Sequence, residues 1–169
     1  MTAIQAITEF KATPRRVLFV CLGNICRSPT AEGVLRTMAA LEAPELRLEI
    51  DSAGTADYHI GAPPDPRSQR AALRRGIDIS GLRGRQVSEH DFEHFDLILA
   101  MDRQNLRELK ALKPRDARAQ LRLFLDYAPE LHLSDVPDPY YRDAAAFEKV
   151  LDLTAAASRG LLAALQEGA

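Results

Sequence analysis

The stretch VLFVCLGNICRSPTAE, residues 17–32, decides the fold of this chain. It opens with the apolar residues 17–20, which are typical of a buried strand. A short polar loop with Gly23 and Asn24 follows. The pair Ser28-Pro29 then predicts a helix start, because serine is a favoured N-cap and proline a favoured first helical residue. Past this point apolar residues recur at helical spacing, at Ala31, Val34, Leu35 and Met38.

The predicted strand, loop and helix have the chemistry of an anion-binding site. Backbone N–H groups of a tight loop can point inward, and the helix adds its own unpaired N–H groups and the positive end of its dipole. Arg27 would close the site with a planar fork of donors that matches two phosphate oxygens. Cys21 would lie at the floor, where the same field stabilises a thiolate and the Ser28 hydroxyl can donate to the sulfur. A thiolate that faces a bound phosphorus atom is positioned as a nucleophile.

The longer string VLFVCLGNICRSPTAEGV resembles the signature loop of the low-molecular-weight protein tyrosine phosphatases. The resemblance covers about residues 15–166. It implies an α/β fold, a four-stranded parallel sheet flanked by helices on both faces in three α/β/α layers. It also implies a protein-tyrosine phosphatase that hydrolyses aryl phosphate monoesters through a cysteinyl-phosphate intermediate, without metal or cofactor. In such an enzyme Cys21 is the nucleophile, and the phosphate is bound by Leu22, Gly23, Asn24, Ile25, Cys26, Arg27 and Ser28.

The rest of the chain alternates predicted strands and helices. Strands are expected at 46–51, as a sheet edge, at 95–101 and at 120–125. Helices are expected at 66–75, 103–110 and 143–165. This alternation predicts a parallel sheet with right-handed crossovers, in which the long loops meet the Cys21 loop at the carboxyl ends of the strands.

A proton donor is the second requirement for cleaving an aryl ester, because the departing phenolate leaves more easily when it is protonated. The loop 127–142 contains VPDPYY, in which two prolines stiffen the backbone around Asp138. This segment resembles the family's general-acid segment, which makes Asp138 the acid of the first step and the base of the second. DSAGTADY, residues 51–58, resembles the family's specificity loop, and the substrate pocket is then lined by Leu22, Ile25, Tyr58, Tyr140 and Tyr141. From the residues alone the two tyrosines after Asp138 are exposed loop aromatics.

Several other polar residues have a structural interpretation. His59, His90 and His94 show no metal-ligand spacing, so no metal site is predicted. Asp102 is expected to act only as a helix cap, and Ser52 as a hydrogen-bonding support of the loop. Asn24 is either a turn residue or, as the resemblance implies, a side chain whose hydrogen bonds hold the loop's shape.

Cys26 has two interpretations. It is either a small buried residue or a redox partner of Cys21, since both cysteines lie in one tight loop. The resemblance implies the second role, a reversible disulfide that protects the nucleophile from overoxidation.

Composition limits the classes of protein to which this chain can belong. The chain has 169 residues, 46% of them apolar and 27% charged, and we expect one domain at 16–169 after a loosely ordered extension at 1–15. A net charge of −2 argues against a nucleic-acid or membrane-surface binder. Neither a membrane-spanning run nor a signal peptide is predicted, and two cysteines do not make a disulfide framework. A cytoplasmic monomer or weak dimer is expected.

Alternative functions remain open at this point. A thiol-linked arsenate reductase shares the anion loop and needs a further cysteine or an external thiol to resolve the arsenate adduct. This chain has no cysteine beyond Cys26, which argues against the self-resolving kind. A protein-arginine phosphatase carries threonine where this chain has Ile25. A non-catalytic phosphate-binding module could dispense with Cys21 or Asp138, yet both are present. The favoured substrate is a protein that bears phosphotyrosine, such as a tyrosine kinase.

Overall fold

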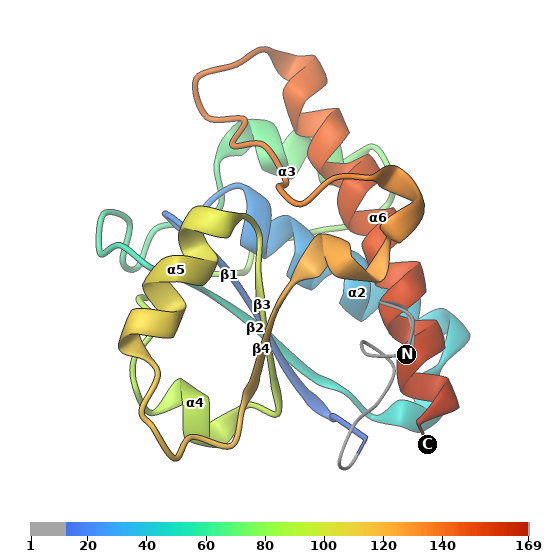
Figure 1. Ribbon diagram of the computed structural model, residues 1–169. Helices are drawn as coiled ribbons and strands as arrows, with labels where there is room; N and C mark the ends of the chain where they lie inside the picture. Colours follow the sequence, from blue (N-terminus) through green and yellow to red (C-terminus); the bar gives the residue numbers. More distant parts are fainter. Residues whose placement is uncertain (1–12, 169) are drawn as a thin grey trace.

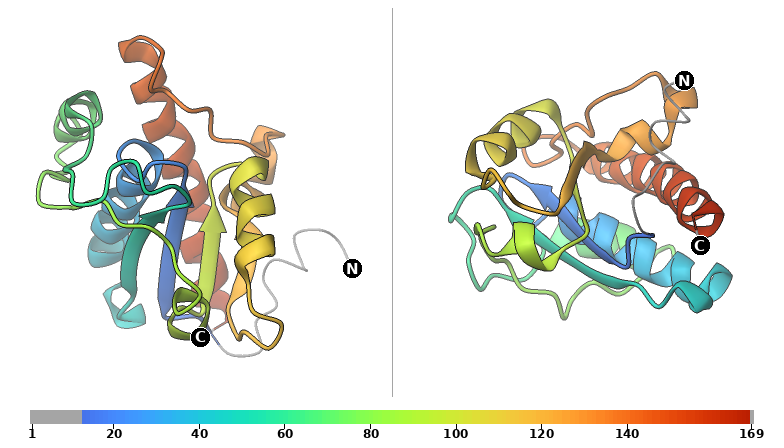
Figure 2. Two further views of the ribbon diagram at one scale, coloured as in Figure 1. Left: turned by 90° about the vertical axis from the view of Figure 1, so that its left-hand side faces the viewer. Right: turned by 60° about the horizontal axis from the view of Figure 1, so that its bottom comes forward.

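The computed structural model describes residues 13–168. Its centre is a sheet of four parallel strands in the order β2-β1-β3-β4. The strands are β1 (Arg16–Cys21), β2 (Glu49–Gly54), β3 (Leu97–Ala100) and β4 (Gln120–Leu123). β1 is thus central and β2 lies at an edge, as predicted. Figure 2 shows the strands running in a common direction.

Helices cover both faces of the sheet (Figure 1). α2 (Arg27–Glu42) and α6 (Ala144–Glu167) pack together on one face, and α4 (Asp91–His94) and α5 (Arg103–Leu112) cover the other. Side chains of β1 alternate between these layers: Val17 and Phe19 face α2 and α6, whereas Leu18 and Val20 face α4 and α5. Burial on both sides explains why β1 is apolar without alternation. The predicted three-layer fold is confirmed.

A third apolar cluster lies beyond the carboxyl ends of the strands. α3 (Pro66–Leu73) packs there against α2 and α6, with Ile25, Ile79 and Phe147 among the buried side chains. α3 begins at a cap made by Asp65, whose carboxylate accepts from the Arg67 N–H at 2.8 Å. This cluster supports the loop between β1 and α2 from the helix side.

The boundaries of several predicted elements differ from those of the structure. β2 starts three residues later than expected, because Leu46 ends a 3-10 turn, η1 (Pro44–Leu46), and Arg47 adopts a left-handed φ of 49°. β4 is followed by η2 (Phe124–Tyr127), where a longer strand was predicted. α4 and the 3-10 turn η3 (Pro129–Leu131) were not predicted. In η1, η2 and α4, tertiary burial of apolar side chains such as Leu46, Phe124 and Phe92 outweighs the local pattern.

The start of α2 also departs from the prediction. The helix begins at Arg27, and Cys26 occupies the cap position without a side-chain hydrogen bond. Ser28, the predicted cap, lies inside the helix, and its hydroxyl faces Cys21. Asp143 caps α6, and this helix buries apolar side chains from Phe147 to Leu165.

The N-terminal extension can be compared only in part. Residues 1–12 lie outside the described residues, whereas 13–15 run directly into β1. The Arg15 N–H donates to the Asp96 carboxylate at 2.9 Å, and the Arg15 carbonyl accepts from the Glu49 N–H at 2.8 Å. These two bonds hold residues 13–15 against the sheet. Within residues 13–168, no helix is long and apolar enough to cross a membrane.

Candidate active site

The loop between β1 and α2 lies at the carboxyl end of the central strand. Two hydrogen bonds fasten it to the segment after β2: Thr55 N–H to the Cys21 carbonyl at 2.9 Å, and Ala56 N–H to the Leu22 carbonyl at 3.0 Å. Gly54 allows this approach, since a Cβ there would lie 2.7 Å from the Leu22 carbonyl oxygen. The loop is therefore shaped by its neighbour as well as by its own residues.

Cys21 is buried at the end of β1, with two hydrogen-bonding groups at its sulfur. The Ser28 hydroxyl lies 3.0 Å from Cys21 Sγ, and the Asn24 N–H donates to Sγ at 3.3 Å. Both groups can stabilise a thiolate at this position.

Asn24 is the centre of a buried hydrogen-bond network. Its φ of 56° lies in the left-handed region, which asparagine tolerates better than most residues. Its Nδ2 donates to the hydroxyls of Ser28 and Ser52, at 2.8 and 3.0 Å, and its Oδ1 accepts from the Arg85 N–H at 3.0 Å. Ser52 in turn donates to Glu32 at 2.7 Å. The bonds expected for Asn24 and Ser52 are thus present.

Arg27 is almost completely buried and bonded on several sides. Its NH1 donates to Asp102 Oδ2 at 2.5 Å and to the Val136 carbonyl at 3.0 Å, and its NH2 lies 3.7 Å from Asp138 Oδ2. Burial alone would lower the pKa of Arg27, but the charges of Cys21, Asp102 and Asp138 outweigh it and raise the pKa above its usual range. The guanidinium is therefore a fixed cation beneath the loop.

Asp102 has a second role that the sequence did not reveal. Its Oδ1 accepts from the Asn105 N–H at 2.7 Å, which is the predicted cap of α5. Its other oxygen holds Arg27. The only available signal was its place at the carboxyl end of a predicted parallel strand, where active-site residues gather.

Asp138 lies in the long loop before α6, and this loop is anchored near its start. Val136 N–H donates to the Met101 carbonyl at 2.8 Å. The Asp135 carboxylate accepts hydrogen bonds from the Arg103 backbone N–H at 2.9 Å and from the Arg103 guanidinium at 2.9–3.3 Å. The Asp138 side chain itself is 44% exposed and accepts from the Tyr140 N–H at 3.1 Å. Its carboxylate is thus open to a bound molecule.

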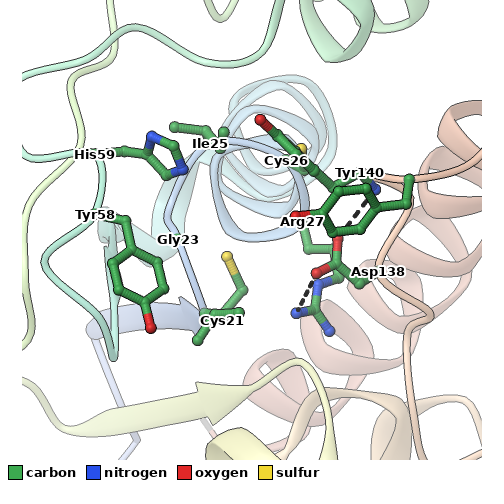
Figure 3. A pocket seen from close by; sticks show the side chains of 11 residues that line it. Cys21, Gly23, Ile25, Cys26, Arg27, Tyr58, His59, Asp138 and Tyr140 are labelled. Atoms are coloured by element: carbon green, nitrogen blue, oxygen red, sulfur yellow. Dashed lines mark hydrogen bonds and ion pairs between the residues drawn. The ribbon is translucent and has the colours of Figure 1, made fainter.

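These groups meet in a pocket of about 330 Å³ (Figure 3). Tyr58 and His59 lie on one side, Asp138 and Tyr140 on the other, and Cys21 lies between them. The pocket is lined by Cys21, Leu22, Gly23, Ile25, Cys26, Arg27, Tyr58, His59, Asp138, Tyr140 and Tyr141. Every predicted site residue is among them except Asn24 and Ser28, whose side chains are buried and do not line the pocket.

The pocket includes one residue that was interpreted as structural. The ring of His59 lies 6.4 Å from that of Tyr58 and 6.5 Å from that of Tyr140, between centroids. Its position directly after the predicted specificity tyrosine was the only signal in the sequence. In residues 13–168 no group of three or more histidine, cysteine or acidic side chains could hold a metal ion.

Cys26 also lines the pocket, as a free thiol like Cys21. Burial, reinforced by the charge of Asp65, raises the pKa of the Cys26 thiol to about 12. Cys26 therefore stays protonated at neutral pH.

Comparison with known proteins agrees with this geometry. The family "Low molecular weight phosphotyrosine protein phosphatase" matches residues 16–169. The low molecular weight protein-tyrosine-phosphatase YfkJ of Bacillus subtilis is 44% identical over 89% of this chain and 96% of its own length.

Solved structures agree as well. A protein tyrosine phosphatase from Entamoeba histolytica superposes with a TM-score of 0.86 at 37% identity, covering 90% of this chain and 97% of that one. An arginine phosphatase from Drosophila superposes with a TM-score of 0.81 at 30% identity, covering 87% and 95%. The two phosphatases share the fold, so the fold alone does not separate their substrates.

The fold and the sequence matches define a protein phosphatase, a phosphoric monoester hydrolase. The chain belongs to the low molecular weight phosphotyrosine protein phosphatase family and is a protein-tyrosine phosphatase. The family, fold and activity predicted from the stretch 17–32 are confirmed.

Proposed function

We propose that Cys21 is the nucleophile, Arg27 the phosphate-binding cation and Asp138 the general acid. In the first step a Cys21 S–P bond forms as the P–O bond to the aryl group breaks. The electron pair goes to the phenolic oxygen, which takes the proton from Asp138. The observation that carries this assignment is the meeting of three groups in one pocket: a hydrogen-bonded sulfur, a buried guanidinium and an exposed carboxylate.

In the second step water attacks phosphorus and the S–P bond breaks. Asp138 takes the proton from that water, and the Ser28 hydroxyl, 3.0 Å from the sulfur, stabilises the departing thiolate. Between the two steps the backbone N–H groups of residues 22–28 and the Arg27 fork hold the phosphoryl oxygens. Asn24 keeps these N–H groups oriented through its buried bonds. Neither step calls for a metal ion or a cofactor.

The substrate we propose is a protein that carries phosphotyrosine, with an autophosphorylating tyrosine kinase as one candidate. The apolar side chains of Leu22 and Ile25 would flank the aryl ring, and Tyr58, Tyr140 and Tyr141 would complete the walls. Ile25 suits an aryl ring better than the threonine of the arginine phosphatases. His59 extends the wall beside Tyr58.

The setting we propose is the reducing cytoplasm, which keeps Cys21 as a free thiol. The protein would act there as a single domain over residues 16–169, as a monomer or weak dimer, without nucleic-acid or membrane partners. These assignments follow from the composition and the net charge of −2.

Cys26 would protect the nucleophile from peroxide. Peroxide converts the Cys21 thiolate to a sulfenic acid, and the Cys26 sulfur then displaces water from it to form a disulfide. A dithiol restores both thiols and activity. We expect Cys26→Ser to lose recoverable activity after peroxide treatment; unchanged recovery would show that Cys26 has no such role.

Hydrolysis of p-nitrophenyl phosphate in the presence of EDTA tests the assignment. We expect turnover by the wild type, none by Cys21→Ser, and a kcat about 10²–10⁴-fold lower in Asp138→Ala, the range of general acid catalysis. A reduced wild-type protein without turnover would contradict it and would direct attention to thiol-dependent arsenate reduction.

A further inference from the structure

A second pocket, of about 600 Å³, adjoins the active-site pocket. It lies between the segment after β2 and the helix α5, and it shares Leu22 and Tyr58 with the active-site pocket. Its lining consists of Leu22, Thr55, Ala56, Tyr58, Gln86, Val87, Glu108, Leu109 and Leu112. A chain that leaves the first pocket over Tyr58 therefore enters the second.

The second pocket presents polar and apolar surface in similar amounts. Its apolar part includes Leu22, which is 37% exposed although it follows a buried strand, and Leu112 on α5. Tyr58, 71% exposed, separates this surface from the active site. Leu22 and Leu112 can pack against the methylene stem of a long side chain whose charged head lies in the polar part of the pocket.

One carboxylate of the lining has no ion-pair partner within the described part of the chain. Glu108 accepts only a hydrogen bond from the Gln104 amide, at 3.0 Å, and within residues 13–168 no lysine or arginine forms an ion pair with it. Two arginines that are adjacent in sequence to lining residues are engaged elsewhere. Arg107 donates to Gln104, and Arg85, next to the lining residue Gln86, is held by two aspartates. Glu108 is thus a carboxylate of the lining that no ion pair in residues 13–168 holds.

A second polar group in the lining also lacks a partner. The Thr55 hydroxyl is shielded from solvent and makes no hydrogen bond. The Thr55 carbonyl, by contrast, accepts from the Gln86 side chain at 3.2 Å. A buried hydroxyl without a partner is unfavourable.

We propose that this pocket is a subsite for a lysine or arginine close in sequence to the phosphotyrosine of the substrate. The stem of the basic side chain lies along Leu22 and Leu112, and its charged head pairs with Glu108. The substrate backbone passes over Tyr58, which lines both pockets. The inference rests on the proposed function, because it requires phosphotyrosine in the first pocket, and it adds a sequence preference to it.

The test is a set of phosphotyrosine peptides in which each of the three positions on either side carries arginine, alanine or glutamate. The measured quantity is the ratio of kcat/KM for the arginine peptide to that for the alanine peptide, which cancels changes in catalysis itself. At one or more positions we expect a ratio of about two to five in the wild type, the range that exposed ion pairs give. Glu108→Gln should bring the ratio to about one, and Glu108→Arg should favour the glutamate peptide at the same position.

A matched control is Glu93→Gln, which removes the same charge from α4, at the opposite end of the sheet. Glu93→Gln should keep the wild-type ratio of kcat/KM for the arginine and alanine peptides, because the preference for arginine requires a negative charge at Glu108. A wild type that hydrolyses p-nitrophenyl phosphate but shows no preference for arginine would overturn the subsite alone. So would a preference that persists in Glu108→Gln. A wild type without aryl phosphatase activity would instead overturn the proposed function.

Discussion

At the residue scale, Asp102 shows how one carboxylate joins the fold to the site. One oxygen caps α5 and the other holds Arg27 at 2.5 Å. Asparagine is as good a cap as aspartate but carries no charge. The two functions of Asp102 can therefore be separated by one substitution.

We predict that Asp102→Asn lowers kcat about tenfold, or about 1.4 kcal/mol, because Arg27 loses a charge-assisted hydrogen bond. The melting temperature should change little, since the cap is kept. Steady-state kinetics and thermal unfolding measure the two effects. Asp143→Asn, at the exposed cap of α6, is the control and should leave kcat unchanged. Equal activity of the two variants would refute a role of Asp102 in positioning Arg27.

The residues of the loop could be identified from the sequence, but their partners could not. Cys21, Arg27 and Ser28 lie within eight residues of one recognisable string, so their proximity was expected. Asn24 reaches Ser52 and Arg85, which lie 28 and 61 positions away along the chain. His59 enters the pocket only because the segment after β2 turns back over the loop.

At the scale of elements, the loop that carries Asp138 depends on α5. Arg103, the first residue of α5, donates hydrogen bonds to the Asp135 carboxylate from its backbone N–H and its guanidinium. Exposed ion pairs are weak singly, but this one has several hydrogen bonds in a fixed geometry.

We predict that Arg103→Ala lowers kcat about threefold on phenyl phosphate and less on p-nitrophenyl phosphate, in line with the small energy of an exposed ion pair. The reason is that a poor leaving group depends more on a well-placed acid. Arg107→Ala, one turn further along α5, is the control. Equal losses on both substrates would show that the Arg103–Asp135 pair does not position Asp138.

The contact between α6 and η2 gives a second prediction at this scale. A Cβ at Gly160 would lie 1.7 Å from the carbonyl oxygen of Tyr127. We predict that Gly160→Ala destabilises the protein by about 3 kcal/mol, although alanine is normally the better helix former. Urea unfolding measures the change, with Gly81→Ala, where a Cβ meets nothing within 4 Å, as the control. A stable Gly160→Ala variant would mean that α6 packs less closely than described.

Elements were predictable where one pattern dominated. β1 and α6 agree with expectation because a continuous apolar run and a long helical stripe leave no alternative. The predicted start of β2 was wrong, because Leu46 and Leu48 have the apolar–polar alternation of a strand although Leu46 belongs to a 3-10 turn that buries its side chain. The single turn of α4 has too few residues for a period to be visible.

At the scale of the whole molecule, burial determines how stability changes in alkali. Burial raises the pKa of Tyr127 from 10.0 to about 12 and that of Cys26 from 9.0 to about 12. The folded chain then holds both protons more tightly than the unfolded chain. Their contribution to stability is present below the unfolded pKa values and is lost as the pH rises toward 12.

We predict that the free energy of unfolding falls between about pH 9 and pH 11, by up to about 1.4 kcal/mol per pH unit for each group above its unfolded pKa. Urea unfolding across this range measures the slope. Tyr127→Phe and Cys26→Ser should each flatten it, whereas Tyr141→Phe, at a 94% exposed ring, should not. A slope unaffected by the two buried substitutions would contradict the assignment.

The central claim is that phosphate passes through a covalent bond to Cys21. The most direct test is rapid acid quenching of the enzyme during turnover of p-nitrophenyl phosphate, followed by mass spectrometry of the peptide with Cys21. We predict a phosphoryl group on Cys21 that accumulates in Asp138→Ala, where attack of water is slowed, and is absent in Cys21→Ser. Turnover with no phosphorylated cysteine, or a phosphoryl group on His59 instead, would contradict it.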